Sequence, residues 1–372
     1  MKKVLLGTTA LVAAGLFAGE ARADFDATVN GSWNTAYGFV DEDDGDGESG
    51  DGRQNQAINQ DWEVHFRAIQ TLDNGMEVGG RVELEGATHN GADSVDSGSA
   101  GNDQVDERWL FFRGGFGELR VGDEDDARKL KAYTAPDPTG FIFGVNSPTF
   151  TFNNLGAGQV ASSNTTIPNV ENDSAKIIYF TPSFGGFQLA VSYAPDGTQD
   201  RSSFGTGGTE EAQVSNSLSA SADYSGEFGA FTIGAGGGYT MASAETGSAD
   251  PTAWNVGLNL GFAGFTVGGS VAFVDNDIDG VDETDVEEST VYDVGVTYTL
   301  DAVTVGLAWS HGEYETGDGD DELDHIQIGA AYALGPGVTL AAMVGTFEYD
   351  DDGPTGSDNE GWQAAVGTGF NF

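Results

Sequence analysis

Apolar and polar residues alternate along much of this chain with a period of two. In the segment 292–300 the even positions carry Tyr, Val, Val, Tyr and Leu, and the odd positions carry Asp, Gly and Thr. The segments 254–262 and 360–372 show the same alternation. This period is typical of β-strands, because successive side chains point to opposite sides. The polar side is made of small and hydrophilic residues, which favours a barrel with lipid outside and a polar lumen over a soluble sandwich.

Short and long connections alternate between the predicted strands. Short turns such as 73–75, 263–264 and 335–337 are followed by longer acidic stretches, and both chain ends fall on the side of the short turns. A barrel of about sixteen strands is too wide for its own side chains to fill and leaves a channel. We therefore predict an all-β, transmembrane antiparallel β-barrel, with strands near 24–39, 57–72, 76–88, 105–115, 118–125, 174–182, 187–195, 213–226, 230–243, 251–262, 265–275, 289–300, 303–316, 323–334, 338–349 and 360–372.

The first residues have the composition of a secretory signal. Lys2 and Lys3 precede the apolar stretch 4–18, and 21–23 reads Ala-Arg-Ala, a small-x-small cleavage site. We expect 1–23 to be a signal peptide and 24–372 to be the exported barrel of a bacterial protein.

The chain is strongly acidic. It has 14 Lys and Arg against 60 Asp and Glu, a formal net charge of −46, and no cysteine. This negative charge repels nucleic acid, which excludes it as a partner. The same charge attracts cations, including divalent ones. The acids gather in runs such as 41–51 and 318–324 between ordered, alternating segments, which argues against general disorder.

One connection differs from the others. No clean alternation returns between Asp125 and Ser174, although most loops are far shorter. The stretch 126–173 contains four prolines and the aromatic patches 141–143 and 150–152. Folding inward against the barrel wall would bury these rings and narrow the lumen.

The chain resembles the general trimeric porins of Gram-negative bacteria, particularly those of the alphaproteobacteria. The most specific segments are RWLFFRGGFGELRVG at 108–122, YFTPSFGGFQLAVSYAP at 179–195 and the terminal Phe372. The resemblance implies a homotrimer in which the third long loop, here 126–173, enters the lumen and forms an eyelet. It also implies that Phe372 is an assembly signal read by the barrel-insertion machinery.

The eyelet of these porins places acids on the loop opposite bases on the wall. By alternation, the inward basic candidates are Arg67, Arg81 and Arg120, and the acidic candidates on the loop are Asp125, Asp126 and Asp137. Family members often carry an arginine where this chain has Asp123, which would weaken the basic side of the eyelet.

These features predict a water-filled channel for passive diffusion of ions and small hydrophilic solutes across the outer membrane, with a preference for cations. A sugar-type selective pore is an alternative in which Phe141, Phe143, Phe150 and Phe152 form an aromatic track, although packing against the wall is the better interpretation of these rings. A non-channel barrel that serves as adhesin or anchor is a further alternative.

Catalysis is not indicated, and we expect no enzyme. The four histidines are His65, His89, His311 and His325, and none is placed with a nucleophile in the manner of a catalytic site. Ser310 and His311 are neighbours on a strand, so their side chains point to opposite faces.

The predicted channel function requires no cofactor. Asp275, Asp277 and Asp279 match the opening of a calcium loop, but Val286 stands where its glutamate is due. A looser Ca²⁺ site at the acidic loops remains as an expectation. These loops also suit divalent cations that bridge to lipopolysaccharide phosphates at the outer-membrane surface.

Overall fold

The computed structural model describes residues 25–43, 50, 52–86, 105–139, 142, 144–146, 148, 150–153, 161, 163–171, 173–197, 214–245, 249–275, 286–317, 319–352 and 358–372. The predicted signal peptide lies outside these residues. Among the described residues, no helix is both long enough and apolar enough to cross a membrane.

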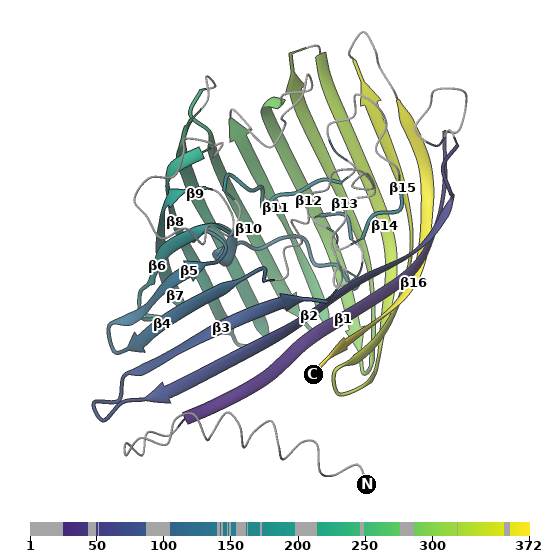
Figure 1. The fold of residues 1–372 in the computed structure, drawn as a ribbon. Helices are drawn as coiled ribbons and strands as arrows, with labels where there is room; N and C mark the ends of the chain where they lie inside the picture. The colour runs from purple at the N-terminus through teal and green to yellow at the C-terminus, as the bar shows by residue number, and fades with distance from the viewer. Residues whose placement is uncertain are drawn as a thin grey trace.

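The described strands form one closed antiparallel barrel in which each strand pairs with its neighbours in sequence and β1 pairs with β16 (Figure 1). The strands are β1 (Phe25–Glu42), β2 (Gln56–Thr71), β3 (Glu77–Glu85), β4 (Arg108–Gly114), β5 (Gly117–Asp123), β6 (Ala175–Phe180), β7 (Phe187–Asp196), β8 (Val214–Phe228), β9 (Phe231–Ala244), β10 (Thr252–Phe262), β11 (Phe265–Asp275), β12 (Val286–Leu300), β13 (Val303–Thr316), β14 (Gly319–Gly335), β15 (Val338–Asp351) and β16 (Asn359–Asn371). The predicted sixteen-strand barrel is confirmed.

The alternation of residues becomes the two faces of the wall. Large apolar side chains such as Val256, Leu258 and Leu260 are exposed on the outside. Asn255 lies on the opposite side of the same strand and is buried within the barrel. Because a lipid-facing surface is apolar and a water-filled interior is polar, this distribution is that of a membrane barrel.

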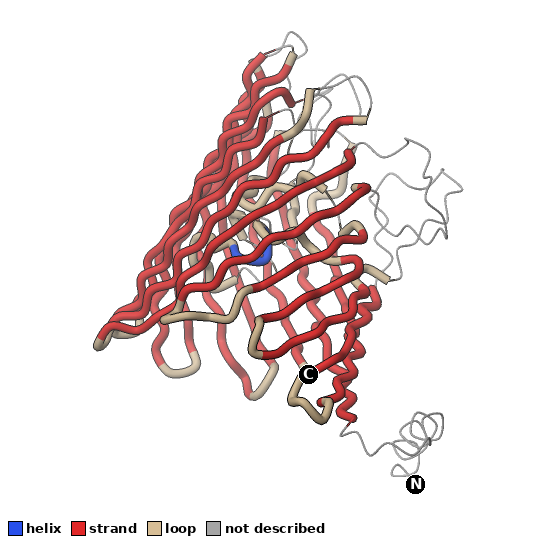
Figure 2. Tube along the Cα trace, turned by 90° about the vertical axis from the view of Figure 1, so that its left-hand side faces the viewer, coloured by secondary structure: helices blue, strands red, loops and turns tan. Residues whose placement is uncertain are grey.

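The described part of the segment between β5 and β6 lies inside the barrel, as the sequence predicted. It crosses the interior in Figure 1, and its one-turn 3-10 helix η1 (Lys129–Lys131) is visible within the barrel in Figure 2. We call residues 124–174 the inward loop. The described core consists mostly of contacts between this loop and the inner wall.

Candidate functional site: the lumen and its inward loop

The inward loop lies against a row of glycines on the lumenal side of the wall. The loop backbone passes so close to β10 that a Cβ at Gly257 would overlap the carbonyl oxygen of Tyr133. The same close approach recurs from strand to strand: Gly236, Gly257, Gly295, Gly306 and Gly329 meet Lys131, Tyr133, Pro136, Pro138 and Thr139 in that order. The missing side chains therefore provide the groove in which the loop is seated.

The start of the inward loop is fixed by buried polar groups. The Asp126 carboxylate accepts a hydrogen bond from the Thr240 hydroxyl at 2.6 Å and one from the Lys129 backbone N–H at 2.7 Å. Arg128 is fully buried, and its Nε donates to Thr240 Oγ1 at 3.0 Å. Such buried networks hold a segment in one position, because releasing either partner leaves a buried charge unpaired.

The middle of the loop is held by two further carboxylates. Asp293 on β12 accepts hydrogen bonds from the Ala135 backbone N–H at 3.1 Å and from Ser270 Oγ at 2.7 Å. Asp137 of the loop accepts from the Thr139 N–H at 2.7 Å and from Gln327 Nε2 on β14 at 3.0 Å.

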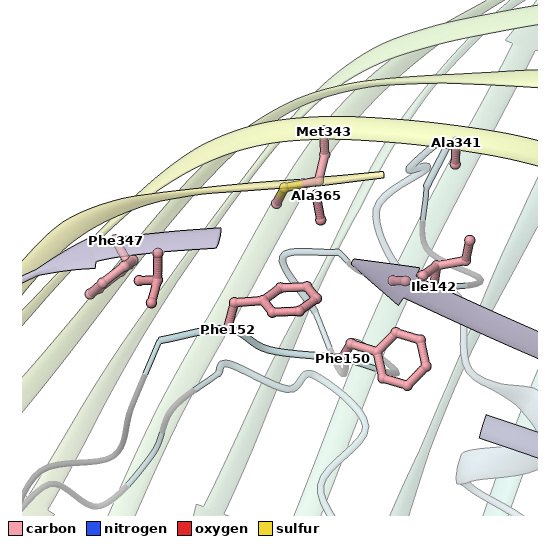
Figure 3. Close-up of a cluster of buried hydrophobic side chains, with 9 residues drawn as sticks. Ile142, Phe150, Phe152, Ala341, Met343, Phe347 and Ala365 are labelled. Carbon is pink, nitrogen blue, oxygen red and sulfur yellow. The ribbon is translucent and has the colours of Figure 1, made fainter. Parts of the chain in front are cut away.

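The far part of the loop packs apolar side chains against the seam of the barrel. Figure 3 shows Ile142, Phe150 and Phe152 lying beneath the strands of the wall. They form one buried cluster with Ala36, Val40, Ala341, Met343, Phe347 and Ala365 of β1, β15 and β16. The prediction that these rings pack against the wall is confirmed for Phe150 and Phe152, whereas Phe141 and Phe143 lie outside the described residues.

The three basic candidates all face the lumen. Arg67 on β2 lies directly opposite Arg81 on β3, and Arg120 on β5 lies opposite the inward Phe111. Alternation along single strands was sufficient to find them. The sequence analysis missed Arg113 at the end of β4.

Most of these bases are neutralised by nearby carboxylates. Arg113 lies 2.7 Å from Glu77 and 3.3 Å from Glu118. Arg120 lies 2.6 Å from Glu118 and 2.7 Å from Glu124. The partners of Arg113 meet it across strands, so they could be found only from the strand register, whereas Glu118 lies two residues before Arg120 on the same strand.

Lys131 of η1 is a further lumenal base that the sequence analysis missed. Its Nζ lies 3.1 Å from Asp223 on β8 and 5.4 Å from the centre of the Phe180 ring. It belongs to the inward loop and not to a regular strand, so alternation gave no signal for it.

The acidic candidates differ in their surroundings. Asp125 is partly exposed and pairs with Lys129 at 2.6 Å. Asp126 and Asp137 are held against the wall by the hydrogen bonds described above. Whether these three carboxylates select ions stays a prediction.

A second acidic group at the loop roots was missed. Glu107, just before β4, and Asp173, just before β6, have carboxylate oxygens close to those of Asp125, all within 4.8 Å of one another. Burial raises the pKa of Glu107 to about 7, and the nearby Glu124 carboxylate adds to this shift. Burial also raises the pKa of Asp173 to about 7, followed by repulsion from Asp125. These groups therefore change charge near neutral pH.

Asp123 does not face the lumen, contrary to its predicted place beside the constriction. Its register puts it with Val121 on the outer side of β5, opposite Arg108, whose Nε lies 2.5 Å from its carboxylate. Successive residues of a strand face opposite sides, so Asp123 lies on the face opposite to that of Arg120. Asp123 therefore cannot replace a lumenal base.

Acidic residues also line the wall next to the loop roots. Three overlapping groups bring together Asp61, Glu63, His65, Glu83, Glu85 and Asp106, and a fourth, separate group consists of Glu107, Asp125 and Asp173. Their oxygen-rich composition suits hard cations. Of the predicted calcium ligands, Asp275 ends β11, whereas Asp277 and Asp279 lie outside the described residues. The calcium site stays a prediction.

The serine and histidine considered for catalysis lie on opposite sides of β13. Ser310 faces inward and donates a hydrogen bond to the Val145 carbonyl at 2.6 Å. His311 faces outward and contacts Asp324 at 3.0 Å. The two side chains therefore do not form a nucleophile–base pair.

The last residue closes the barrel. The Phe372 N–H donates to the Gly31 carbonyl at 3.1 Å, and the Gly31 N–H donates back to the Phe372 carbonyl at 3.1 Å. The Phe372 ring packs against Phe370 and Trp33, with ring centres 5.4 and 5.2 Å away.

Solved structures with this fold are outer-membrane proteins. The anion-selective porin of Comamonas acidovorans is 17% identical, with a TM-score of 0.60 over 94% of this chain and 100% of that chain. OmpT of Vibrio cholerae, in a trimer form, is 15% identical, with a TM-score of 0.58 over 94% of this chain and 99% of that chain. At these identities the likeness concerns the fold alone.

Sequence comparison identifies the family. Outer membrane porin protein 32 of Delftia acidovorans is 30% identical over 203 residues, which are 54% of this chain. The match spans about half of that relative's length, at 51%. The family model described as Gram-negative porin matches residues 7–352. The chain therefore belongs to the Gram-negative porin family.

Proposed function

We propose that this protein forms a water-filled channel for passive diffusion of ions and small hydrophilic solutes, and that the channel prefers cations. Its family and its barrel fold place it in the outer membrane. A wide barrel that is narrowed by an inward loop supports a pore, because the described part of the loop lies against the inner faces of the strands.

The observation that carries the cation preference is the balance of lumenal charge. Arg81, Arg113 and Arg120 are each paired with carboxylates, so they attract anions weakly. The four carboxylate groups described above lie on the side of the long loops. Their acids outnumber the bases that pair with them, which are Arg81 and Lys129. Within about a Debye length, such an excess enriches cations and depletes anions.

The Comamonas porin that shares this fold is anion-selective, so the fold itself does not determine the sign of selectivity. Reversal potentials across a planar bilayer with asymmetric KCl test the proposal. We expect cation preference at low salt that weakens at high salt. Anion preference at low salt would overturn the selectivity, and absence of conductance would overturn the channel.

The sugar-type alternative loses support from the inward loop. Phe150 and Phe152 are each only 8% exposed and pack against the wall, so they do not offer a track to a solute. None of the described contacts favours an adhesin over a channel.

We also propose a homotrimer that uses the outer face of β3–β6. These strands have 9, 7, 7 and 6 residues, whereas a tilted strand needs about 9–11 to cross a membrane. The same face carries Arg108 among exposed apolar side chains, and its guanidinium pairs with the buried Asp123. Charges in contact with lipid are costly, so coverage by another subunit explains both features. The trimer form of the Vibrio protein is consistent with this.

A further inference from the structure

The lipid-facing side of the wall carries a row of carboxylates near the long loops. Asp324 on β14 lies directly opposite Glu348 on β15, and Glu348 lies directly opposite Glu360 on β16. Alternation puts them on the same face as exposed apolar side chains such as Ile326 and Val344. Like charges directly opposite on paired strands repel each other, so the row is unfavourable without a cation beside it.

This half of the chain supplies no lysine or arginine that could compensate the row. Residues 202–372 contain neither residue type. Within the described structure Asp324 pairs with His311, whose Nδ1 lies 3.0 Å from its carboxylate, and neither Glu348 nor Glu360 has an ion-pair partner. Carboxylates that face lipid are costly, so we expect a cation from outside the chain.

The row borders a pocket on the outer face. The pocket has a volume of about 490 Å³ and extends across β14, β15, β16 and β1, which lie side by side (Figure 1). Its lining includes Asp41, Asp324, Ile326, Glu348, Glu360 and Trp362. We call it the outer pocket. It combines several carboxylates with an aliphatic side chain and an indole ring.

Two tryptophans orient the carboxylates at its two ends. Trp309 Nε1 donates to Asp324 at 2.8 Å, and Trp362 Nε1 donates to Asp41 at 3.0 Å. Tryptophan is enriched where lipid headgroups meet acyl chains, because its ring is apolar and its N–H is polar. The outer pocket therefore lies at the depth of the headgroups, at the edge of the apolar band.

The composition of the outer pocket favours an ammonium group over a metal ion. An ammonium group donates charge-assisted hydrogen bonds to several carboxylates and is attracted by an indole ring. A divalent ion needs oxygen ligands and gains nothing from Ile326 or Trp362. Beneath the pocket, exposed side chains such as Ile328 and Val344 offer an apolar surface to acyl chains.

We propose that the outer pocket binds a membrane lipid whose headgroup carries a primary ammonium group. The ammonium group lies among the carboxylates of Asp324, Glu348 and Glu360, and the acyl chains follow the apolar wall below them. The proposal is independent of the channel function, because the outer pocket faces lipid and not the lumen.

Native mass spectrometry of the folded wild-type protein tests the lipid chemistry. Phosphatidylethanolamine and its N-acetylated form are compared, because acetylation removes the ammonium charge and keeps the phosphate and both chains. We expect the first lipid to remain bound and the second to be lost. Equal retention of the two lipids overturns the proposal. Release of the first lipid by EDTA does so as well, since a divalent ion would then bridge the carboxylates to the phosphate.

A further arm distinguishes a lipid from a soluble amine. An excess of free ethanolamine should leave phosphatidylethanolamine bound, because the acyl chains contribute to its affinity. Release of the lipid by free ethanolamine would show that the outer pocket selects small amines, and would overturn the proposal.

Substitutions test the location of the site. Glu348→Gln/Glu360→Gln should weaken phosphatidylethanolamine binding about tenfold, because it removes two charged acceptors. The matched control is Glu313→Gln/Glu315→Gln, which removes two exposed acids from the same face of β13 outside the lining of the outer pocket. The control should bind the lipid as the wild type does. Equal losses in the two double variants overturn the site. If Glu348→Gln/Glu360→Gln fails to fold, the comparison of the two lipids on the wild type still decides the proposal.

Discussion

The Asp126 carboxylate accepts a hydrogen bond from the Thr240 hydroxyl at 2.6 Å, which ties the start of the inward loop to β9 on the far side of β6, β7 and β8. Both groups are buried, and Arg128 lies beside them, its Nη2 3.7 Å from Asp126. Replacing Asp126 therefore removes a hydrogen-bond acceptor and the nearest charge partner of a buried arginine.

Asp126→Asn should loosen the root of the loop. We expect faster amide exchange of Lys129 and Leu130 and a noisier single-channel current, with a local cost of about 1–3 kcal/mol. Asp125→Asn is the matched control, because its carboxylate is partly exposed and should affect selectivity more than loop order. Equal exchange in the two variants would show that Asp126 is not the anchor.

The strands were predictable because their signals are local. Alternation and turn residues placed all sixteen, with ends that differ by at most four residues, as at Gly319 of β14 against the predicted 323. Lumenal faces followed for Arg67, Arg81 and Arg120 by the same alternation. Asp123 was misplaced because its position was taken from the family resemblance, whereas alternation from Arg120 puts it on the opposite face of β5.

Contacts between distant parts of the chain were not predictable. The groove for the loop depends on glycines of five strands, and each is unremarkable within its own strand. The Arg113–Glu77 pair depends on the β3–β4 register, which one sequence does not fix in advance. The compensation of Arg113 therefore needed the structure.

The glycine groove can be tested at its closest contact. Gly257→Ala would force a Cβ into the Tyr133 carbonyl, so the loop should move toward the pore axis and single-channel conductance should fall. Gly335→Ala is the control, because no atom lies within 4 Å of the Cβ it would add. A Gly257→Ala channel with wild-type conductance would mean that the loop position does not limit the current.

Cation preference should depend on pH near neutrality. Glu107 and Asp173 have pKa values of about 7, so lowering the pH from about 8 to about 6 protonates both and removes negative charge at the loop roots. We expect the K⁺/Cl⁻ permeability ratio to fall over this window, and the Glu107→Gln/Asp173→Asn variant to show a much smaller change.

The effect of pH on folding stability distinguishes titration of these carboxylates from unfolding of the barrel. Folding raises both pKa values, so ionisation of these carboxylates lowers the stability of the folded state as pH rises from about 4 to about 7. The full loss of stability remains at higher pH. Acidification to about 6 therefore relieves part of this loss. A fall in selectivity that accompanies loss of folded barrel, measured by heat-modifiable gel mobility, would contradict this explanation.

The proposed trimer interface can be tested through its ion pair. Arg108→Ala removes the partner that lies 2.5 Å from the buried Asp123 carboxylate. Losing an ion-pair partner destabilises a buried carboxylate, so trimers should dissociate at a lower temperature on semi-native gels. Arg113→Ala changes the same strand on its lumenal side and should leave trimer stability nearly unchanged.

The terminal phenylalanine should act through its ring as well as its backbone. Phe372→Ala keeps the two hydrogen bonds to Gly31 but loses the contacts with Phe370 and Trp33 at the seam between β1 and β16. We expect less folded protein in the outer membrane after a pulse-chase, and a further decrease when residue 372 is deleted, because the seam then also loses its hydrogen bonds. Phe187→Ala, an exposed ring beside a short turn, provides the control for simple loss of an aromatic surface residue. If Phe372→Ala and Phe187→Ala assemble equally well, the terminal ring has no special part in closing the barrel.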